Sequence, residues 1–515
     1  MSLFRCWRTL LPWLLGAFLL RSLLAAVVPL LPDETYYWEW TRRLQGGYFD
    51  HPPGIAFLTR LGTQLFGDTR TGVRAGPAIA ALITHGAAAV LAWNLGGRGE
   101  RGDAAARRGA MLLTLVPIAT LGLVLATPDA ALFMTTMLAL VAVERALAAP
   151  LRSMQSTAWW TAAGVALGGA FLSKYTAVLL PADLVVACLV HPALRVRFRE
   201  WGPWLASMIG LLLFAPVVLW NSQHDWISFR FQLGHGFTPS ARGNPLSREL
   251  ELVGAQMGLA SPVLFVLMAM VVILAMRDGW RARGSVQVTD VAARRFAIAV
   301  MSAVPLAFFA VSAWRRSVEA NWPALIYPGA IALLATSTSE WTRGRAWRIG
   351  LGIAALLLAV VAVQAWRPVL PLAPRKDPIA RAHGWETLAA AVDSARRDAF
   401  LNGTAKRWVA ADRYQDASEL AFHLADQPTV FSLNLGGRAN QYDLWPTIVD
   451  RVKAGDGLVA AFDANTNGDA IALRVSSWFE ATKKGPIVSL RRGTGEVTQR
   501  RIWSYRSARG VPSAR

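Results

Sequence analysis

The sequence predicts a polytopic α-helical membrane protein that ends in a small α/β domain. Of its 515 residues, 54% are hydrophobic and only 17% are charged, and the mean hydropathy is +0.34. A soluble protein of this length has fewer apolar and more charged residues. The apolar residues gather in runs of roughly 20, the length that crosses a hydrocarbon core of about 30 Å. This pattern stops near residue 367.

Eleven apolar runs are candidates for transmembrane helices. We expect them at residues 9–31, 74–95, 110–126, 130–148, 157–172, 175–191, 203–220, 258–276, 296–313, 322–337 and 349–367. Ser173, Lys174 and Tyr175 separate the fifth run from the sixth, and a charge in the middle of a bilayer is costly enough to favour a turn there. Because the first run is long and ten more follow, we expect an uncleaved first helix and not a signal peptide.

Basic residues that flank the runs predict the orientation, because Lys and Arg are retained on the cytoplasmic side of short loops. Arg5 and Arg8 place the N-terminus in the cytoplasm, and an odd number of spans places the C-terminus outside. We therefore expect a multi-pass protein of the cytoplasmic (inner) membrane. Residues 1–370 would form the transmembrane domain, and residues 371–515 an extracytoplasmic domain.

The C-terminal domain mixes charged residues and turn formers with short runs rich in β-formers. Strands are expected at 407–410, 429–434 and 457–462, and helices at 385–398 and 416–424. Alternation of the two types is typical of an α/β domain.

Charge and cysteine content exclude two classes of function. The formal net charge is +20, but the basic residues lie between apolar runs and form no basic domain. Nucleic-acid binding is therefore a poor explanation of the positive charge. The two cysteines, Cys6 and Cys188, lie far apart in or near apolar segments, which excludes a disulfide framework and a zinc site built on sulfur.

Two outer segments, residues 32–73 and 221–257, are long and polar in a chain of otherwise short loops. Sites are often built on such loops. In the first segment, Tyr37, Trp40 and Leu44 recur at helical spacing, so we expect interfacial helices that lie along the membrane surface.

Acidic residues stand at two predicted membrane boundaries. Asp33 and Glu34 follow Pro32, and Asp129 lies in the turn Thr127-Pro128-Asp129. Acids at these positions are ordinary helix caps or turn residues. They are also candidates for catalysis, since a carboxylate at this depth can take a proton from an acceptor hydroxyl.

Lys174 is the most informative single residue of the sequence. The chain has 53 basic residues, and Lys174 is the one Lys before residue 376, all other basic residues there being Arg. A compact ammonium charge suits phosphate binding or neutralisation of a leaving group. An ordinary cytoplasmic anchor would be Arg in this chain.

Further polar residues on the outer side have both structural and functional explanations. Asp50 and His51 precede a double proline, and His51 is a candidate contact for phosphate or metal, or a polar turn residue. His224, in the stretch 221–226, is either a sugar or phosphate contact or part of a polar loop. Arg315 and Arg316 stand on the outer side against the positive-inside tendency, which an anionic lipid headgroup would explain.

A P-loop and an H-E-x-x-H helix do not occur in the sequence. One G-x-G-x-x-G spacing occurs, at residues 97–102, but it lies between two apolar runs and does not follow a predicted strand as a dinucleotide-binding fingerprint would. An enzyme that works outside the cytoplasm, where nucleotide donors are missing, needs an activated group carried by a lipid.

Five stretches carry a specific resemblance. They are Asp33-Glu34-Thr35-Tyr36-Tyr37-Trp38, Tyr48-Phe49-Asp50-His51-Pro52-Pro53, Thr127-Pro128-Asp129, Leu172-Ser173-Lys174-Tyr175 and Asn321-Trp322-Pro323. Together they resemble the polytopic GT-C glycosyltransferases that use polyprenyl-phosphate sugars, the family of the dolichyl-phosphate-mannose protein mannosyltransferases and the lipid A aminoarabinose transferases. The resemblance covers roughly residues 30–330 and implies a GT-C-like fold.

The resemblance also implies a reaction and roles for residues. The donor would be a sugar on a polyprenyl phosphate, transferred with inversion to a hydroxyl of a lipid, glycan or protein of the cell envelope. Asp33 would be the general base. The roles that we assign are catalytic for Asp33, Glu34 and Asp129, donor-phosphate binding for Lys174, His51, Arg315 and Arg316, and substrate binding for Tyr36, Tyr37, Asp50, His224 and Asn321.

His51-Pro52-Pro53 matches the protein mannosyltransferases, whereas the aminoarabinose transferases have Lys-Pro-Pro at this place. The resemblance therefore does not single out an aminoarabinose transferase. A phosphate leaving group departs as an anion, so a cation can replace a general acid and no cofactor is required. A divalent metal near Asp50, His51 and Glu34 is compatible with the scheme but not demanded by it.

A polytopic lipid or sugar transporter is the alternative from another class. Transporters place ionisable residues near the bilayer midplane between repeated halves. Here the candidate charges stand at the outer boundary, and the sequence shows no internal repeat.

Overall fold

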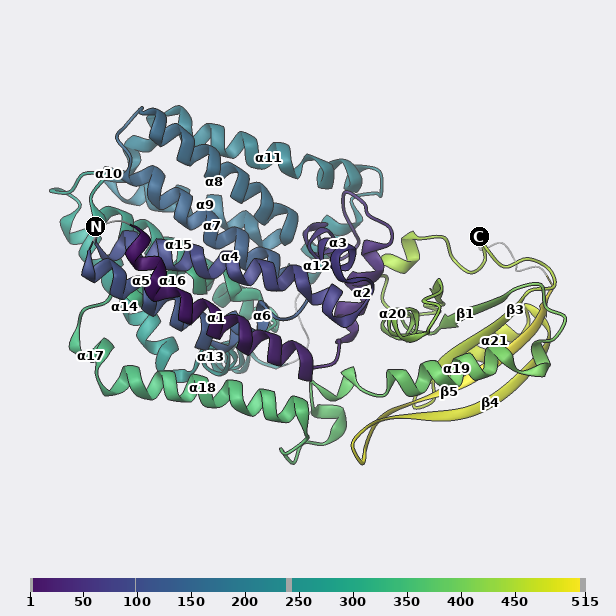
Figure 1. Ribbon diagram of the computed structural model, residues 1–515. Coiled ribbons are helices and arrows are strands. Elements are labelled where there is room, and N and C mark those ends of the chain that lie inside the picture. The colour runs from purple at the N-terminus through teal and green to yellow at the C-terminus, as the bar shows by residue number, and fades with distance from the viewer. Residues whose placement is uncertain (1–2, 98, 238–242, 510–515) are drawn as a thin grey trace. The chain divides into compact units, whose positions relative to one another are not determined.

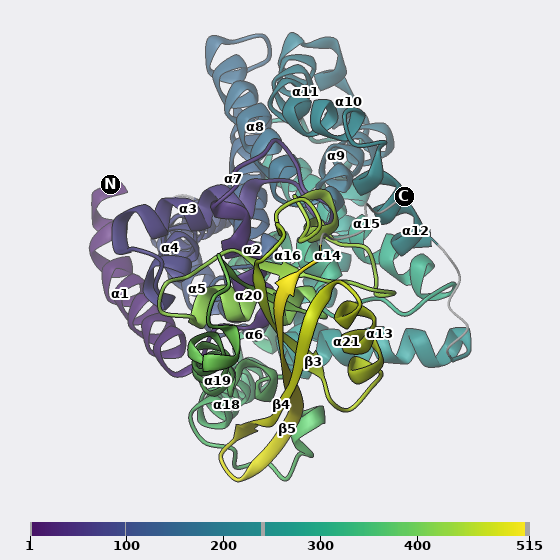
Figure 2. The same cartoon turned by 90° about the vertical axis from the view of Figure 1, so that its right-hand side faces the viewer.

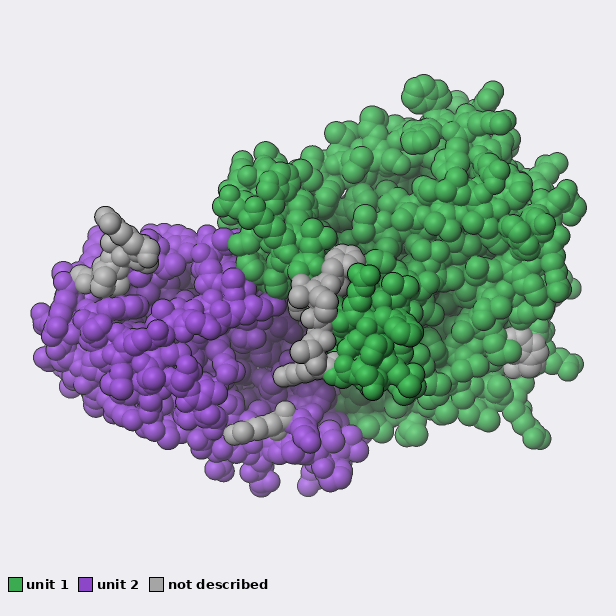
Figure 3. Space-filling model, turned by 180° about the vertical axis from the view of Figure 1, so that it is seen from behind, with its two compact units in different colours: residues 1–25, 45–66, 74–361 green, residues 26–44, 67–73, 362–515 purple. Residues whose placement is uncertain are grey.

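The computed structural model describes residues 3–97, 99–237 and 243–509. The chain divides into two compact units, which Figure 3 colours separately. We call residues 1–25, 45–66 and 74–361 the helical unit, and residues 26–44, 67–73 and 362–515 the sheet unit.

The helical unit is built from long apolar helices and the short segments that join them (Figure 1). Its helices, some of which extend a few residues beyond the unit, are α1 (Leu3–Val27), α3 (Gly54–Phe66), α4 (Arg70–Gly96), α5 (Glu100–Leu115), α6 (Pro117–Gly122), α7 (Pro128–Ala148), α8 (Met154–Ser173), α9 (Leu179–Val190), α10 (Pro192–Arg195), α11 (Trp201–Ser222), α12 (Ile227–Phe237), α13 (Pro245–Ala260), α14 (Pro262–Ala282), α15 (Val291–Ala313), α16 (Ile326–Thr336), α17 (Glu340–Arg343) and α18 (Arg345–Trp366).

Each of the eleven predicted runs lies on one of these helices or on two consecutive ones. Among the described residues, seven helices are long and apolar enough to cross a membrane, and eight if the bent pair at 175–199 is one span. The third run is broken at Val116, where Pro117 starts a new helix because proline cannot continue the old one. The polytopic helical architecture is confirmed, and the number of eleven spans stays a prediction.

The core of the helical unit depends on close approach between α7, α8 and α11, which run side by side in Figures 1 and 2. A methyl group on Gly164 of α8 would lie 2.7 Å from the carbonyl oxygen of Ala206 on α11. One on Gly202 would lie 2.0 Å from the ring of Trp160. Small residues at such contacts let helices pack backbone to backbone, as is common in membranes.

Helix α3 has the features expected of an interfacial helix. Ile55, Ala56 and Thr59 are buried against the helical unit, while Phe57 and Leu61 on the other face are 48% and 44% exposed. An exposed apolar stripe on a short helix is typical of a surface that meets the boundary between headgroups and acyl chains.

The sheet unit contains one five-stranded sheet in the order β2-β1-β3-β5-β4. Its strands β3, β5 and β4 are labelled in Figure 2. Strands β2, β1 and β3 are parallel, and β5 and β4 continue the sheet as an antiparallel hairpin. The strands are β1 (Arg407–Ala411), β2 (Val430–Ser432), β3 (Gly457–Asp463), β4 (Phe479–Arg492) and β5 (Gly495–Ala508), and the helices are α2 (Pro32–Thr41), α19 (Trp385–Arg397), α20 (Tyr414–His423) and α21 (Gly468–Ser476). The three predicted strands and two predicted helices of this region coincide with β1, β2, β3, α19 and α20, which confirms a small C-terminal sheet domain.

Helix α2 differs from the amphipathic surface helix that the sequence predicts. It ends at Thr41 and is buried along nearly its whole length, including the charged residue Glu39. The reason is its packing on α20 within the sheet unit: the hydroxyls of Thr35 and Ser418 are 3.1 Å apart, and the ring of Trp38 meets Phe422 edge-on at 5.1 Å.

Candidate functional site

Three residues that are far apart in the sequence meet at one end of α7. The ammonium of Lys174 donates to Oδ1 of Asp129 at 2.8 Å, and the amide of Asn321 donates to Oδ2 of the same carboxylate at 2.6 Å. We call Asp129, Lys174 and Asn321 the charged cluster. All three are among the residues that the sequence singled out, and the structure brings them together.

Local sequence explains how each side chain reaches the cluster. Pro128 starts α7, so Asp129 stands in its first turn, where a carboxylate is favoured by the helix dipole. Lys174 ends α8 in an extended conformation, which leads the chain into the short turn at 175–178. Asn321 directly precedes a second short turn, which starts at Trp322.

The cluster is a buried ion pair with unequal hydrogen-bonding capacity. The side chains of Lys174 and Asp129 are 8% and 9% exposed. Both oxygens of Asp129 are occupied, whereas an ammonium has three donors and Asp129 takes one of them. Asp129 is therefore placed to orient Lys174, and Lys174 has donors left for an anion.

The turn that contains His51 packs directly on the segment that carries Lys174. A methyl group on Gly54 would lie 2.5 Å from the carbonyl oxygen of Leu172 and 3.0 Å from Cα of Ser173. The backbone can approach this closely only because residue 54 has no Cβ. The structure thus brings the His-Pro-Pro turn beside the charged cluster, as residues of one site would be.

Side chains of α12 hold this turn in place. The hydroxyl of Ser228 donates to the carbonyl of Tyr48 at 2.7 Å, and the amide of Gln232 donates to the carbonyl of Asp50 at 2.6 Å. The rings of Phe49 and Phe231 lie 5.0 Å apart. Asp50 is buried, with 6% exposure.

His224 and the arginine pair have neighbours that explain their positions. His224 stacks on Trp220 with ring centroids 4.1 Å apart, and its Nδ1 lies 2.7 Å from the carbonyl oxygen of Trp220. Arg316 places its guanidinium over the ring of Trp322 at 5.4 Å, and Arg315 is exposed. These contacts give His224 a packing role, while the roles of the three residues in binding stay predictions.

The first acidic pair belongs to the sheet unit, and its two members differ. Glu34 is fully buried, and its carboxylate accepts from the backbone N–H of Leu31 at 3.0 Å, so it caps the start of α2. Asp33 is 45% exposed and lies 3.8 Å from Arg381. Displacement of water by the surrounding protein raises the pKa of Asp33 above its ordinary value, and Arg381 opposes this rise.

Tyr36 and Tyr37 are held firmly inside the sheet unit. The hydroxyl of Tyr36 accepts from the backbone N–H of Gln441 at 2.8 Å, and its ring lies 4.7 Å from that of Tyr414. Tyr37 packs edge-on against Trp40 at 4.9 Å. These contacts fix the helix that carries Asp33, and substrate binding by the two tyrosines stays a prediction.

Arg381 is the residue near Asp33 that sequence reasoning missed. It comes from a short turn after residue 379, about 350 residues away in the chain, and its side chain is 60% exposed. No periodicity or motif marks it, because an exposed Arg in a polar domain is ordinary.

Metal binding has no obvious place among the residues that the structure describes. In that part of the chain, three or more His, Cys, Asp or Glu side chains nowhere converge so as to hold an ion. The divalent metal considered near Asp50, His51 and Glu34 stays a prediction.

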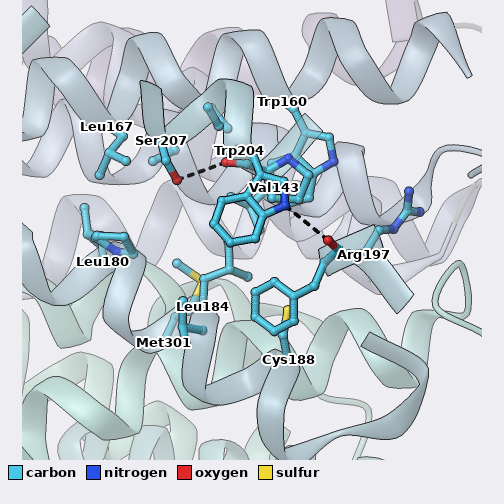
Figure 4. Close-up of a pocket in the computed structure, with 17 residues that line it drawn as sticks. Val143, Trp160, Leu167, Leu180, Leu184, Cys188, Arg197, Trp204, Ser207 and Met301 are labelled. Carbon is cyan, nitrogen blue, oxygen red and sulfur yellow. Dashed lines mark hydrogen bonds between the residues drawn. The ribbon is translucent and has the colours of Figure 1, made fainter. Parts of the chain in front are cut away.

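An apolar pocket lies between α8, α9 and α11 of the helical unit (Figure 4). Two of the side chains that line it donate to backbone carbonyls: Ser207 to Pro203 at 3.0 Å, and Trp204 to Phe198 at 3.1 Å. Arg197 is fully buried and donates to Leu147 and Ala149 instead of the pocket. The lining is therefore mostly apolar and suits a hydrocarbon chain.

Comparison with known proteins supports the class of protein that the fold and the site suggest. Residues 50–220 match the family model described as dolichyl-phosphate-mannose-protein mannosyltransferase. A lipid A galacturonosyltransferase, RgtD, of Rhizobium johnstonii is 27% identical over 345 residues, 66% of this chain and 67% of that protein. An undecaprenyl phosphate-alpha-4-amino-4-deoxy-L-arabinose arabinosyl transferase of Pseudomonas savastanoi is 28% identical over 240 residues, 43% of this chain and 44% of that protein.

The fold has a counterpart among solved structures. ArnT from Cupriavidus metallidurans, in its apo state and bound to undecaprenyl phosphate, matches with a TM-score of 0.59 at 18% identity over 98% of each chain. The expected resemblance is thereby confirmed: the chain is similar in sequence and fold to the GT-C glycosyltransferases that use polyprenyl-phosphate sugars.

Proposed function

We propose that this protein is an inverting glycosyltransferase that moves a sugar from a polyprenyl phosphate to a hydroxyl of a cell-envelope lipid, glycan or protein on the outer face of the inner membrane. The observation that carries the proposal is the charged cluster, a buried ammonium held by a carboxylate and with donors left for an anion. The named relatives, which act on lipid A or use undecaprenyl phosphate, support the donor class.

In this mechanism Lys174 binds the phosphate of the donor and stabilises the negative charge that grows on it when the bond to the sugar breaks. A cation fixed in a site of low dielectric does this without reorganising. Asp129 keeps the ammonium aimed and supplies its counter-charge, since a buried charge without a partner is costly. The leaving phosphate needs no proton, so the mechanism contains no general acid.

Asp33 is the proposed base that takes the proton of the acceptor hydroxyl. It is the better candidate of the acidic pair because the carboxylate of Glu34 is engaged in capping α2. A raised pKa makes a carboxylate a stronger base at neutral pH. Attack by the hydroxyl on the face opposite the phosphate inverts the anomeric carbon.

The proposed orientation places the N-terminus in the cytoplasm and residues 371–515 outside. It is supported by the Arg clusters that flank alternate runs of the sequence. In this orientation no nucleotide sugar reaches the site, which is consistent with a lipid-linked donor.

The test is transfer of radiolabelled sugar from polyprenyl-phosphate donors in membranes that carry equal amounts of folded protein. Asp33→Asn and Lys174→Ala should each abolish transfer. Two controls remove exposed charges that take part in ordinary ion pairs: Arg277→Ala in the helical unit and Asp426→Asn in the sheet unit. Full activity in Asp33→Asn would show that Asp33 is not the base, and full activity in Lys174→Ala would show that Lys174 is not the phosphate site.

A further inference from the structure

The backbone segment 314–321, which ends in Asn321 of the charged cluster, has no helix or strand of its own beyond a turn. Its position must therefore come from its neighbours. Two buried polar side chains of α13, Arg248 and Gln256, contact it at its two ends.

Gln256 reaches the end that carries Asn321. Its amide nitrogen donates to the carbonyl of Ala320 at 2.9 Å, and its amide oxygen accepts from the hydroxyl of Tyr327 at 2.9 Å. Gln256 is fully buried and Tyr327 is 1% exposed. Both ends of the amide are thus used, and its orientation is fixed by the two partners.

Arg248 holds the other end of the same segment. Its Nε donates to the carbonyl of Ala313 at 2.8 Å, and Nη2 donates to that of Trp314 at 2.5 Å. Nη1 donates to Gly243 at 2.8 Å. One guanidinium therefore ties the end of α15 to α13.

These contacts form one continuous path to the ammonium. Ala320 is adjacent to Asn321, Asn321 donates to Asp129, and Asp129 accepts from Lys174. A shift of the backbone at residue 320 moves the amide of Asn321, and the carboxylate that orients the ammonium then loses one of its two bonds.

We infer that Gln256 is a positioning residue of the charged cluster, which sets the geometry of Lys174 toward the donor phosphate through Ala320, Asn321 and Asp129. The inference rests on the proposed function of Lys174. A buried glutamine in the middle of a helix is otherwise an unfavourable choice, since burying a polar group is costly unless both its ends are bonded.

The test measures binding of polyprenyl monophosphate, with KM and kcat for transfer, on the full-length chain in lipid nanodiscs. When its carboxyl is ionised, Gln256→Glu keeps the shape and the bond from Tyr327 but cannot donate to Ala320. One net hydrogen bond is worth about 0.5–1.5 kcal/mol, so we expect Kd and KM for the donor to rise about three- to tenfold, with kcat nearly unchanged.

Three further variants separate positioning from packing. Tyr327→Phe keeps the bond from Gln256 to Ala320, and Ser261→Ala removes a buried bond from the end of the same helix to Gly350. Ser261→Ala should change Kd by no more than about twofold, as expected of a site outside the path. Tyr327→Phe removes one of the two bonds that orient the Gln256 amide, so it should raise Kd, but by less than Gln256→Glu. Adding Gln256→Glu to Asn321→Ala should cause no further loss, because both act through one path.

The outcomes are distinct. If Lys174→Ala no longer binds polyprenyl monophosphate while Gln256→Glu binds it with the Kd of wild type, the inference is wrong and the proposed function stands. If Lys174→Ala leaves binding unchanged, the proposed function itself fails. Should Gln256→Glu not fold, Gln256→Met removes the same donor without adding a charge, and unchanged Kd in that variant overturns the inference.

Discussion

Removing the ammonium of the charged cluster while leaving its carboxylate in place tests the geometry most sharply. In Lys174→Met the apolar stem is kept and the charge is lost. Asp129, whose side chain is 9% exposed, then holds a buried negative charge with the amide of Asn321 as its remaining cluster partner. Breaking a buried ion pair from one side typically costs about 3–5 kcal/mol.

We expect the lower end of that range because the bond from Asn321 to Asp129 is retained at 2.6 Å. A loss of about 3 kcal/mol corresponds to a fall in Tm of about 6 °C in a large domain, at roughly 2 °C per kcal/mol. Tryptophan fluorescence of the full-length chain in nanodiscs, heated at a fixed scan rate, measures the fall. Asp129→Asn should lower Tm by a similar amount, since it leaves the ammonium unpaired.

The double variant Lys174→Met/Asp129→Asn contains neither buried charge. Its Tm should fall by no more than half as much as that of either single variant, because removing both partners of a buried pair costs far less than removing one. A double variant whose loss equals the sum of the two single losses would refute the coupling on which this reasoning depends. Binding of polyprenyl monophosphate should fail in Lys174→Met and in the double variant, because recovery of the fold does not restore the cation.

Three other perturbations probe different parts of the two units. Arg381 and Arg438 both lower the pKa of Asp33, and Arg381→Gln removes the larger of these two effects. The pKa therefore rises and the acid limb of kcat/KM should move to higher pH; an unmoved limb would show that another group is the base. Burial raises the pKa of Glu419 from 4.5 to about 7, so its protonation stabilises the folded sheet unit fully below pH 4.5, and this contribution is lost as pH rises through about 7. Glu419→Gln should flatten the pH dependence of Tm in that window, and an identical pH profile would contradict the burial argument. Gly54→Ala forces a methyl group to 2.5 Å from the carbonyl oxygen of Leu172, so the backbone there must shift. A shift that costs at least about 1.4 kcal/mol should weaken the binding of polyprenyl monophosphate by about tenfold or more. A Kd equal to that of wild type would show that the turn is not part of the site.

The helical unit could be predicted well because its signal is local. Hydropathy over about 20 residues finds each run whatever it packs against, and the structure has helix on all eleven. Breaks within a run were harder to predict. Pro117 splits the third run into two helices, and the mean hydropathy over a window of about 20 residues hardly changes with one proline.

The sheet unit shows what local patterns leave out. Its buried strands β1 and β3 are apolar and were predicted, whereas the hairpin of β4 and β5 was missed. Strand β4 contains Lys483, Lys484 and Pro486 and is half-exposed at the edge of the sheet, so it has no continuous apolar pattern. The burial of α2 depends on α20, nearly 400 residues further along, and no feature of residues 32–41 encodes that partner.

The charged cluster was predictable in part for chemical reasons. Lys174 stands out because all other Lys or Arg positions before residue 376 are Arg, and Asp129 follows a proline at a boundary between spans. Asn321 came from the family resemblance alone. Gln256 had no signal, because one glutamine within α13 looks like any residue on the polar face of a helix until its two partners are known.

The central claim is that Lys174 holds the phosphate of a lipid-linked sugar while the sugar is transferred. Its most direct test counts products in one reaction: sugar joined to the acceptor and polyprenyl monophosphate released, in proteoliposomes supplied with a doubly labelled donor. The account predicts equal amounts of both with wild type and neither with Lys174→Met. Movement of intact donor across the bilayer with no polyprenyl monophosphate released would contradict it and favour a transporter.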